Sequence, residues 1–138
     1  MEATNQFLFV YGTLLQPGNQ FADYLTQHCK FVSDGKVKGR LYNIGEYPGA
    51  VIDDNEERSI YGCIFIMDEP ELVLKVIDDF EGIGELYEYP QEYIRQQVDV
   101  FTDDGDIKCW IYVYNLSVNG FLHIIGGDYM QYLNNAVK

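Results

Sequence analysis

The segment Phe7-Leu8-Phe9-Val10-Tyr11-Gly12, residues 7–12, is the most informative stretch for the fold. Its first five residues are all apolar or aromatic, so a strand here would be buried on both faces. Gly12 then ends the run. Residues 59–67 form a longer strand pattern that also carries apolar residues on both faces. Strands of this kind are typical of a closed or nearly closed barrel, in which one face lines the interior and the other is covered.

The rest of the chain predicts an α+β fold, because strands and helices do not alternate regularly. Asp34-Gly35 predicts a turn, and Gly39 a possible bulge in the strand that follows it. No internal repeat or linker is visible, and we expect a single domain over residues 1–138. The strands are expected at about 7–11, 36–44, 50–52, 59–67, 92–101 and 107–115, and the helices at about 19–30, between 68 and 82, and around 127–134.

The helix between Asp68 and Gly82 has the clearest signals. Asp68 is a suitable N-cap, Glu71 three residues later completes a capping box, and Gly82 is a natural stop. Apolar residues recur at the spacing of one helical face. The helix should therefore pack on the outside of the barrel through Val73, Val76, Ile77 and Phe80.

Composition excludes several classes of function. The formal net charge of −13 repels nucleic-acid phosphates and anionic membranes, so we expect neither as a partner. Two histidines are too few for a histidine-rich metal site. Cys29, Cys63 and Cys109 are widely spaced in apolar surroundings, which predicts buried, reduced thiols and favours a cytoplasmic location. The first six residues do not resemble a signal peptide.

The segment Tyr11-Gly12-Thr13-Leu14 is the first candidate binding element. A glycine directly after a buried strand lets the backbone turn with its N–H groups exposed, and successive amides in such a turn bind carboxylate or phosphate. A simple turn at the end of a strand explains the same four residues. The segment alone does not decide between the two interpretations.

Glu81 is the candidate catalytic acid. It follows Asp78 and Asp79 at the C-terminal end of the predicted helix, where the helix dipole is negative. Repulsion from the dipole and from neighbouring acids disfavours ionisation and would raise a carboxyl pKa, as proton transfer near neutral pH requires. A solvated helix end with screened charges is the alternative. Glu81 differs from its neighbours because it lies between Phe80 and Gly82 and could turn inward.

Tyrosines on two predicted strands could line a polar site. Tyr93 and Arg95 alternate on one strand, and Trp110, Tyr112 and Tyr114 on another. Tyrosine rings can form a wall while their hydroxyls donate hydrogen bonds, although packing in the barrel would explain most of them. The acidic pairs at 53–54 and 103–104 could contact Mg²⁺, but paired acids in turns usually face water.

The ordered set of residues 9–14, 79–82 and 93–95 resembles the gamma-glutamylcyclotransferase-like family, and most closely its gamma-glutamylamine cyclotransferase and avirulence-induced-gene-like branch. The resemblance extends from about Phe7 to Tyr132 and includes the strand at 110–114. It implies a small mixed β-barrel of about six strands flanked by two or three helices, in agreement with the strand pattern.

The resemblance also implies roles for individual residues. Backbone amides at Gly12, Thr13 and Leu14, with Tyr11 beside them, would hold the substrate α-carboxylate, and Glu81 would be the general acid and base. Further residues that line the expected site are Pro48 in the second loop, Tyr93 and Tyr114. The segment 84–92 is longer than the family pattern, which leaves Tyr87 and Tyr89 as rivals of Tyr93.

The implied activity is ring closure of a gamma-glutamyl amide to 5-oxoproline, with release of an amine or amino acid. It needs no cofactor and no metal, its partner is a small gamma-glutamyl compound, and we expect a monomer or a weak homodimer. Three alternatives stay open: a dedicated enzyme of a biosynthetic pathway, a non-catalytic carboxylate-binding module, and an acid-rich Mg²⁺-dependent hydrolase.

Overall fold

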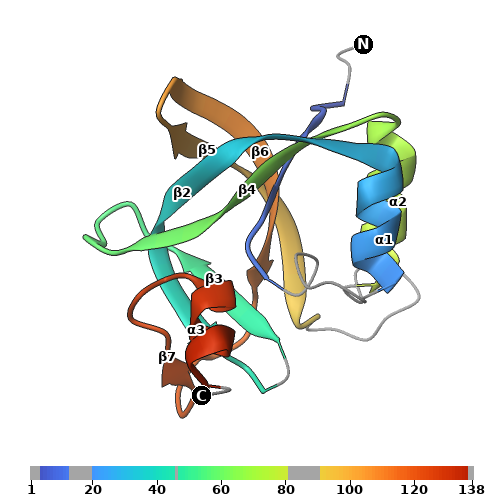
Figure 1. Ribbon diagram of the computed structural model, residues 1–138. Coiled ribbons are helices and arrows are strands. Elements are labelled where there is room, and N and C mark those ends of the chain that lie inside the picture. Colours follow the sequence, from blue (N-terminus) through green and yellow to red (C-terminus); the bar gives the residue numbers. More distant parts are fainter. Residues whose placement is uncertain (1–3, 13–19, 46, 81–90, 137–138) are drawn as a thin grey trace.

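The computed structural model describes residues 4–12, 20–45, 47–80 and 91–136 (Figure 1). Seven strands and three helices are formed within these ranges. In chain order they are β1 (Phe7–Val10), α1 (Gln20–His28), β2 (Cys29–Asn43), β3 (Pro48–Ile52), β4 (Ser59–Met67), α2 (Pro70–Phe80), β5 (Tyr93–Thr102), β6 (Gly105–Tyr114), β7 (Leu122–His123) and α3 (Tyr129–Ala136).

Five of the strands close into a mixed barrel, as the sequence predicted. They follow the order β2-β4-β1-β6-β5, and β5 returns to β2 through the pair Lys36 and Phe101. The β1–β6 pair is parallel and the other pairs of the ring are antiparallel. The short strands β3 and β7 pair with the C-terminal half of β2 and extend the sheet beyond the ring.

Strand β2 differs from the prediction. It begins at Cys29 and runs through Asp34-Gly35, where a turn was expected. A Cβ on Gly35 would lie 2.5 Å from the Val100 Cγ1 methyl on β5, so a side chain at this position would collide with Val100. The register shift lies between Phe31 and Ser33, not at Gly39. Gly39 instead marks the point where β2 changes its partner from β4 to β3.

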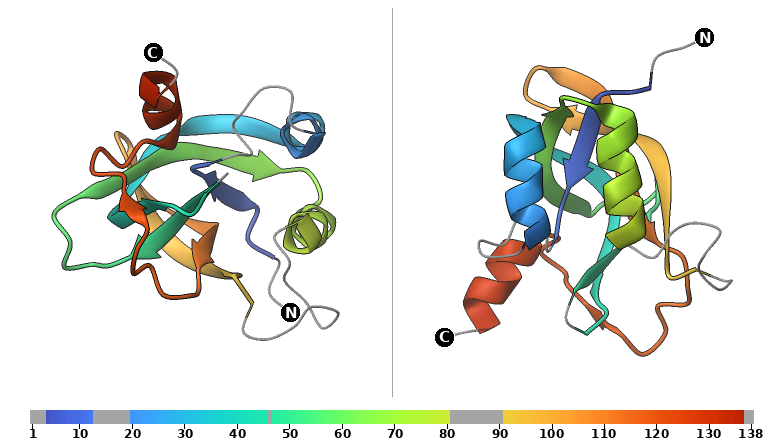
Figure 2. Two further views of the ribbon diagram at one scale, coloured as in Figure 1. Left: turned by 90° about the horizontal axis from the view of Figure 1, so that it is seen from below. Right: turned by 90° about the vertical axis from the view of Figure 1, so that its right-hand side faces the viewer.

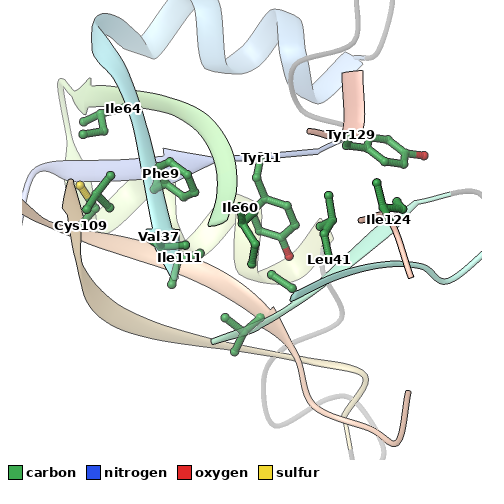
Figure 3. Packing of buried hydrophobic residues seen from close by; sticks show 13 residues of the cluster. Phe9, Tyr11, Val37, Leu41, Ile60, Ile64, Cys109, Ile111, Ile124 and Tyr129 are labelled. Carbon is green, nitrogen blue, oxygen red and sulfur yellow. The ribbon is translucent and has the colours of Figure 1, made fainter. Parts of the chain in front are cut away.

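The two apolar faces of β1 belong to two different cores. Phe9 points into the barrel, where the buried residues include Val37, Ile60, Ile64 and Ile111 (Figure 3). Leu8 and Val10 point outward, into a second core. Helices α1 and α2 cover this outer face on either side of β1 (Figure 2), and contribute Leu25 from α1 and Val73, Leu74 and Ile77 from α2.

Helix α2 packs outside the barrel as predicted, with two differences in detail. Leu74 is buried in addition to Val73 and Ile77, whereas Val76 is half-buried and the Phe80 side chain lies outside the described residues. The capping box does not form. The Asp68 N–H donates to the His28 carbonyl, and the Glu71 carboxylate accepts a hydrogen bond from Thr4. Asp68 is not the N-cap either: its side chain accepts from the Glu69 N–H at 2.6 Å, before the helix begins at Pro70, and the Val73 N–H donates to the Glu69 carbonyl, which makes Glu69 the N-cap.

All three cysteines lie within the described residues and each is a free thiol, as predicted. Cys29 and Cys109 are buried, whereas Cys63 is half-buried. Burial raises the pKa of Cys29 and of Cys109 to about 12, with smaller contributions from Asp68 and Asp99 respectively. These thiols therefore stay protonated at neutral pH.

Candidate active site

The end of β1 is packed tightly against the start of β3. A Cβ on Gly12 would lie 2.5 Å from Pro48 Cγ, so no larger residue fits here without moving the proline ring. Tyr11, directly before Gly12, is buried, and its hydroxyl donates to the Tyr112 carbonyl at 2.5 Å. The two residues join the strand end to β3 and β6. Thr13 and Leu14 lie outside the described residues, so the expected anion-binding turn is described only to Gly12.

Tyr93 and Tyr114 are direct partners across the β5–β6 pair, at the end of the barrel where Pro48 lies. The Tyr93 hydroxyl donates to the Pro48 carbonyl at 2.6 Å, and the rings of Tyr93 and Tyr114 meet edge to face with centroids 5.6 Å apart. A Cβ on Gly49 would lie 2.9 Å from the Tyr114 Cβ. Five residues predicted for the site therefore lie in one connected group: Tyr11, Gly12, Pro48, Tyr93 and Tyr114.

Glu92 belongs to this group although the sequence did not single it out. Its carboxylate accepts a hydrogen bond from the Tyr47 hydroxyl, and the Tyr47 ring lies 5.9 Å from that of Tyr93. Burial and the Glu92 charge raise the pKa of Tyr114, which keeps its hydroxyl protonated and able to donate. The only sequence signal for Glu92 was its place directly before Tyr93.

The C-terminal end of α2 corrects one argument made from the sequence. The sequence predicts mutual repulsion among the acids there, but Asp78 is ion-paired with Arg95, with 2.9 Å between Asp78 Oδ1 and Arg95 Nε. Asp78 also accepts a hydrogen bond from the Tyr112 hydroxyl at 2.7 Å. Glu81 follows Phe80, the last residue of α2, and lies outside the described residues. Tyr87 and Tyr89 also lie outside them.

His123 and the acidic turn at 53–54 make local structural contacts. His123 stacks on Tyr42 with ring centroids 5.2 Å apart, and burial lowers its pKa, with a further contribution from Arg58. Asp53 accepts a hydrogen bond from the Asn55 N–H within its own turn. In the part of the chain that the structure describes, no group of three or more potential ligand side chains could hold a metal ion.

Comparison with known proteins identifies the family. The sequence pattern of the family described as "Gamma-glutamyl cyclotransferase, AIG2-like" matches residues 8–131, which is nearly the whole chain. The protein belongs to this family. The match spans both the Tyr11-Gly12 end of β1 and the strands that carry Tyr93 and Tyr114.

Individual relatives agree with this assignment. The chain is 33% identical over 129 residues to YkqA of Bacillus subtilis, which is provisionally named a gamma-glutamylcyclotransferase. The aligned region spans 93% of this chain but only 42% of YkqA. The chain is 32% identical to a Vibrio cholerae protein with the same provisional name, with coverage of 90% and 95%. The chain thus spans less than half of one relative and nearly all of the other.

Solved structures show the same fold. The crystal structure of YkqA superposes with a TM-score of 0.73 at 30% identity over 98% of this chain and 44% of that one. A mouse AIG2-like protein superposes with a TM-score of 0.70 at 22% identity, over 90% of this chain and 87% of that one. None of the helices that the structure describes is long and apolar enough to cross a membrane.

Proposed function

We propose that the protein is a gamma-glutamyl cyclotransferase, which converts a gamma-glutamyl amide into 5-oxoproline and a free amine or amino acid. The observation that carries the proposal is the connected group of Gly12, Pro48, Tyr93 and Tyr114. These residues come from four separate places in a chain that belongs to this family, and they lie beside the strand end that leads into the candidate anion-binding turn.

The proposed chemistry follows from the substrate. Backbone amides at Gly12, Thr13 and Leu14 hold the α-carboxylate, and Glu81 as a carboxylate removes a proton from the α-ammonium group. The free amine attacks the γ-carbonyl carbon and forms a five-membered ring, helped by being held close to it. The ring nitrogen still carries two protons at this stage. The bond from that carbon to the leaving nitrogen then breaks as protonated Glu81 gives its proton to the departing amine, and the second proton of the ring nitrogen passes through the Glu81 carboxylate to the same amine, which leaves as an ammonium group. The roles of Glu81, Thr13 and Leu14 rest on the family resemblance.

Tyr93 and Tyr114 support the proposal as fixed, neutral hydrogen-bonding groups. The Tyr93 hydroxyl donates its proton to the Pro48 carbonyl and so holds the start of β3 against Gly12. Tyr114 keeps its phenol proton because burial and Glu92 raise its pKa. Neither residue is needed as a base, which leaves the proton transfers to Glu81.

The test is a screen of gamma-glutamyl compounds for release of 5-oxoproline. Three classes of compound should be compared, because the site does not define the leaving group: gamma-glutamyl amines, gamma-glutamyl amino acids, and lysine whose side-chain amine carries the gamma-glutamyl group. We expect release from at least one class, and the same rate with and without a chelator. Saturable binding of 5-oxoproline without any release would instead indicate a binding module. Activity that a chelator abolishes would indicate a metal-dependent hydrolase.

A further inference from the structure

Three side chains from three elements meet at the last turn of α2. Arg95 from β5 contacts the Asp78 carboxylate through two nitrogens: Nη2 donates a hydrogen bond to Oδ2 at 3.1 Å, and Nε lies 2.9 Å from Oδ1 as an ion-pair contact that is not aligned as a hydrogen bond. Tyr112 from β6 donates its hydroxyl to Asp78 Oδ1 at 2.7 Å and lies 3.4 Å from the Leu74 carbonyl oxygen. Arg95 and Tyr112 are direct partners across the β5–β6 pair. The barrel therefore holds the helix end through one carboxylate.

Arg95 is fixed from its other side as well. Its guanidinium lies over the Trp110 ring, 4.5 Å from the centroid, and the Trp110 Nε1–H donates to the Asn5 carbonyl at 3.0 Å. The side chains of Arg95 and Asp78 are only 26% and 18% exposed, so water screens the pair less than it screens a surface ion pair. A planar guanidinium with two contacts also restricts orientation more than a lysine would.

Tyr112 connects this helix end with the predicted binding turn. Its carbonyl accepts the Tyr11 hydroxyl at 2.5 Å, while its own hydroxyl reaches Asp78. Tyr11 directly precedes Gly12, and Asp78 precedes Glu81 by three residues. One residue of β6 is thus bonded to the segment that leads into residues 12–14 and to the helix that leads into Glu81.

We propose that Asp78, Arg95 and Tyr112 are positioning residues for the proposed cyclotransferase reaction. They fix the position of the end of α2 relative to the end of β1. Because Glu81 directly follows α2, they thereby determine the position of its carboxylate. The inference rests on the proposed function for its catalytic part, whereas its structural part does not depend on any activity. None of the three side chains needs to touch the substrate.

A merely stabilising role predicts a different outcome. It would lower the melting temperature of a variant but leave turnover by the folded enzyme unchanged. A positioning role lowers kcat, because the proton-transferring group is misplaced, and leaves KM nearly constant. The α-carboxylate is held by backbone amides after Tyr11, and the Tyr112 carbonyl that fixes Tyr11 is unchanged when the phenol hydroxyl is removed.

The decisive variant is Tyr112→Phe, which removes one oxygen atom and keeps the ring in the core. Hydrogen exchange of the amides in residues 76–80 should accelerate about tenfold, because a hydrogen bond to a charged group is lost. Exchange in the first turn of α2 should not change. With a substrate from the screen, kcat should fall about tenfold and KM should stay within about twofold. Tyr61→Phe is the matched control, because Tyr61 is exposed on β4, and it should leave both measurements unchanged.

Arg95→Lys gives a second, independent test because it keeps the charge and loses the two-nitrogen contact. It should also accelerate exchange at residues 76–80 and lower kcat. Unchanged exchange in both variants would overturn the inference whatever the enzyme does. Accelerated exchange with an unchanged kcat would overturn the positioning role. If the wild type releases 5-oxoproline from no compound, the proposed function fails, and exchange alone then decides whether the network fixes the helix end.

Discussion

The two cores on either side of β1 are built differently. The barrel interior consists of side chains such as Phe9, Ile64 and Ile111, each 1% exposed or less. The outer core under α1 and α2 contains Leu8 and Val73, but at its edge it also contains the Asp78–Arg95 ion pair and the Tyr112 hydroxyl. Apolar packing is tolerant of small shifts in direction, whereas an ion pair with two contacts is not.

This difference suggests that one region mainly determines stability and the other mainly determines the position of the helix end. The barrel interior supplies most of the apolar burial and hence most of the stability. The outer core fixes the direction of α2, whose end leads into Glu81. Variants in the barrel should therefore change the free energy of unfolding first, and variants at the helix end should change turnover first.

The largest effect is expected for Glu81→Gln. The amide keeps the shape of the side chain but cannot accept and return a proton, so turnover should fall toward the upper end of about 10²–10⁴-fold. Binding of 5-oxoproline should survive, because in the proposed mechanism backbone amides of residues 12–14, not Glu81, hold the carboxylate. Turnover and binding of a confirmed substrate and of 5-oxoproline are the measurements.

Glu57→Gln is the control for this variant, since Glu57 is exposed in the turn before β4 and the change removes the same charge. Asp78→Asn is unsuitable as a control because Asp78 is ion-paired with Arg95. A Glu81→Gln enzyme with near wild-type turnover would remove Glu81 from the mechanism.

In the barrel, Phe9→Ala should produce the opposite profile. Phe9 is 1% exposed and lies among the largest buried side chains, so its truncation leaves a cavity and should cost about 3–5 kcal/mol of unfolding free energy. Turnover by the fraction that remains folded should change little. Urea unfolding measures the first quantity and an assay at low temperature the second. A loss below about 1 kcal/mol would mean that the barrel interior can collapse around the gap.

Gly12→Ala should change both the stability of the protein and its binding of substrate. The new Cβ would lie 2.5 Å from Pro48 Cγ, and overpacking of this kind typically costs about 1–3 kcal/mol. The strand end should shift, which should also raise KM if residues 12–14 hold the substrate carboxylate. The double variant Gly12→Ala with Pro48→Ala should restore both the unfolding free energy and KM. The new Cβ at position 12 would lie an ordinary 4.0 Å from the Cβ at position 48, and the backbone carbonyl that accepts from Tyr93 is kept. Failure of the second change to restore stability would show that Gly12 is required for another reason.

Local patterns in the sequence predicted much of the fold. Residues 59–67 were predicted as a strand and form β4 with the same bounds, because apolar residues on both faces signal burial directly. The ring closure between Lys36 and Phe101 and the change of partner at Gly39 were not predictable, since both depend on strands far away in the chain. Strand β7 was missed because its two residues carry no periodic pattern.

The candidate site was predictable to a similar degree. The family resemblance gave Tyr11, Gly12, Pro48, Tyr93 and Tyr114, and the structure brings these five together. The partner of Asp78 was not predictable, because Arg95 is 17 residues away and reaches it only when β5 lies beside α2. Charge alone at the helix end suggested repulsion, and the tertiary contact gives Asp78 an opposite charge beside it.

The smallest effect is expected from the two buried thiols, one in each core. Cys109 lies in the barrel and Cys29 under the helices, and burial raises the pKa of each to about 12 from an ordinary value of 9.0. Between these two values the unfolded chain loses thiol protons that the folded chain retains. The unfolding free energy should therefore be fully present below pH 9 and decrease as the pH rises toward 12.

Removing either thiol should flatten this alkaline decrease by a similar amount. Cys109→Ala and Cys29→Ala, each measured by urea unfolding at pH 7 and at about pH 10.5, isolate the two contributions, because repulsion from the net charge of −13 is common to both variants and the wild type. Equal flattening would mean that the helix layer excludes water as well as the barrel interior does. A flatter curve for Cys109→Ala alone would contradict the expectation of similar contributions and would mean that the outer core opens to solvent before the barrel.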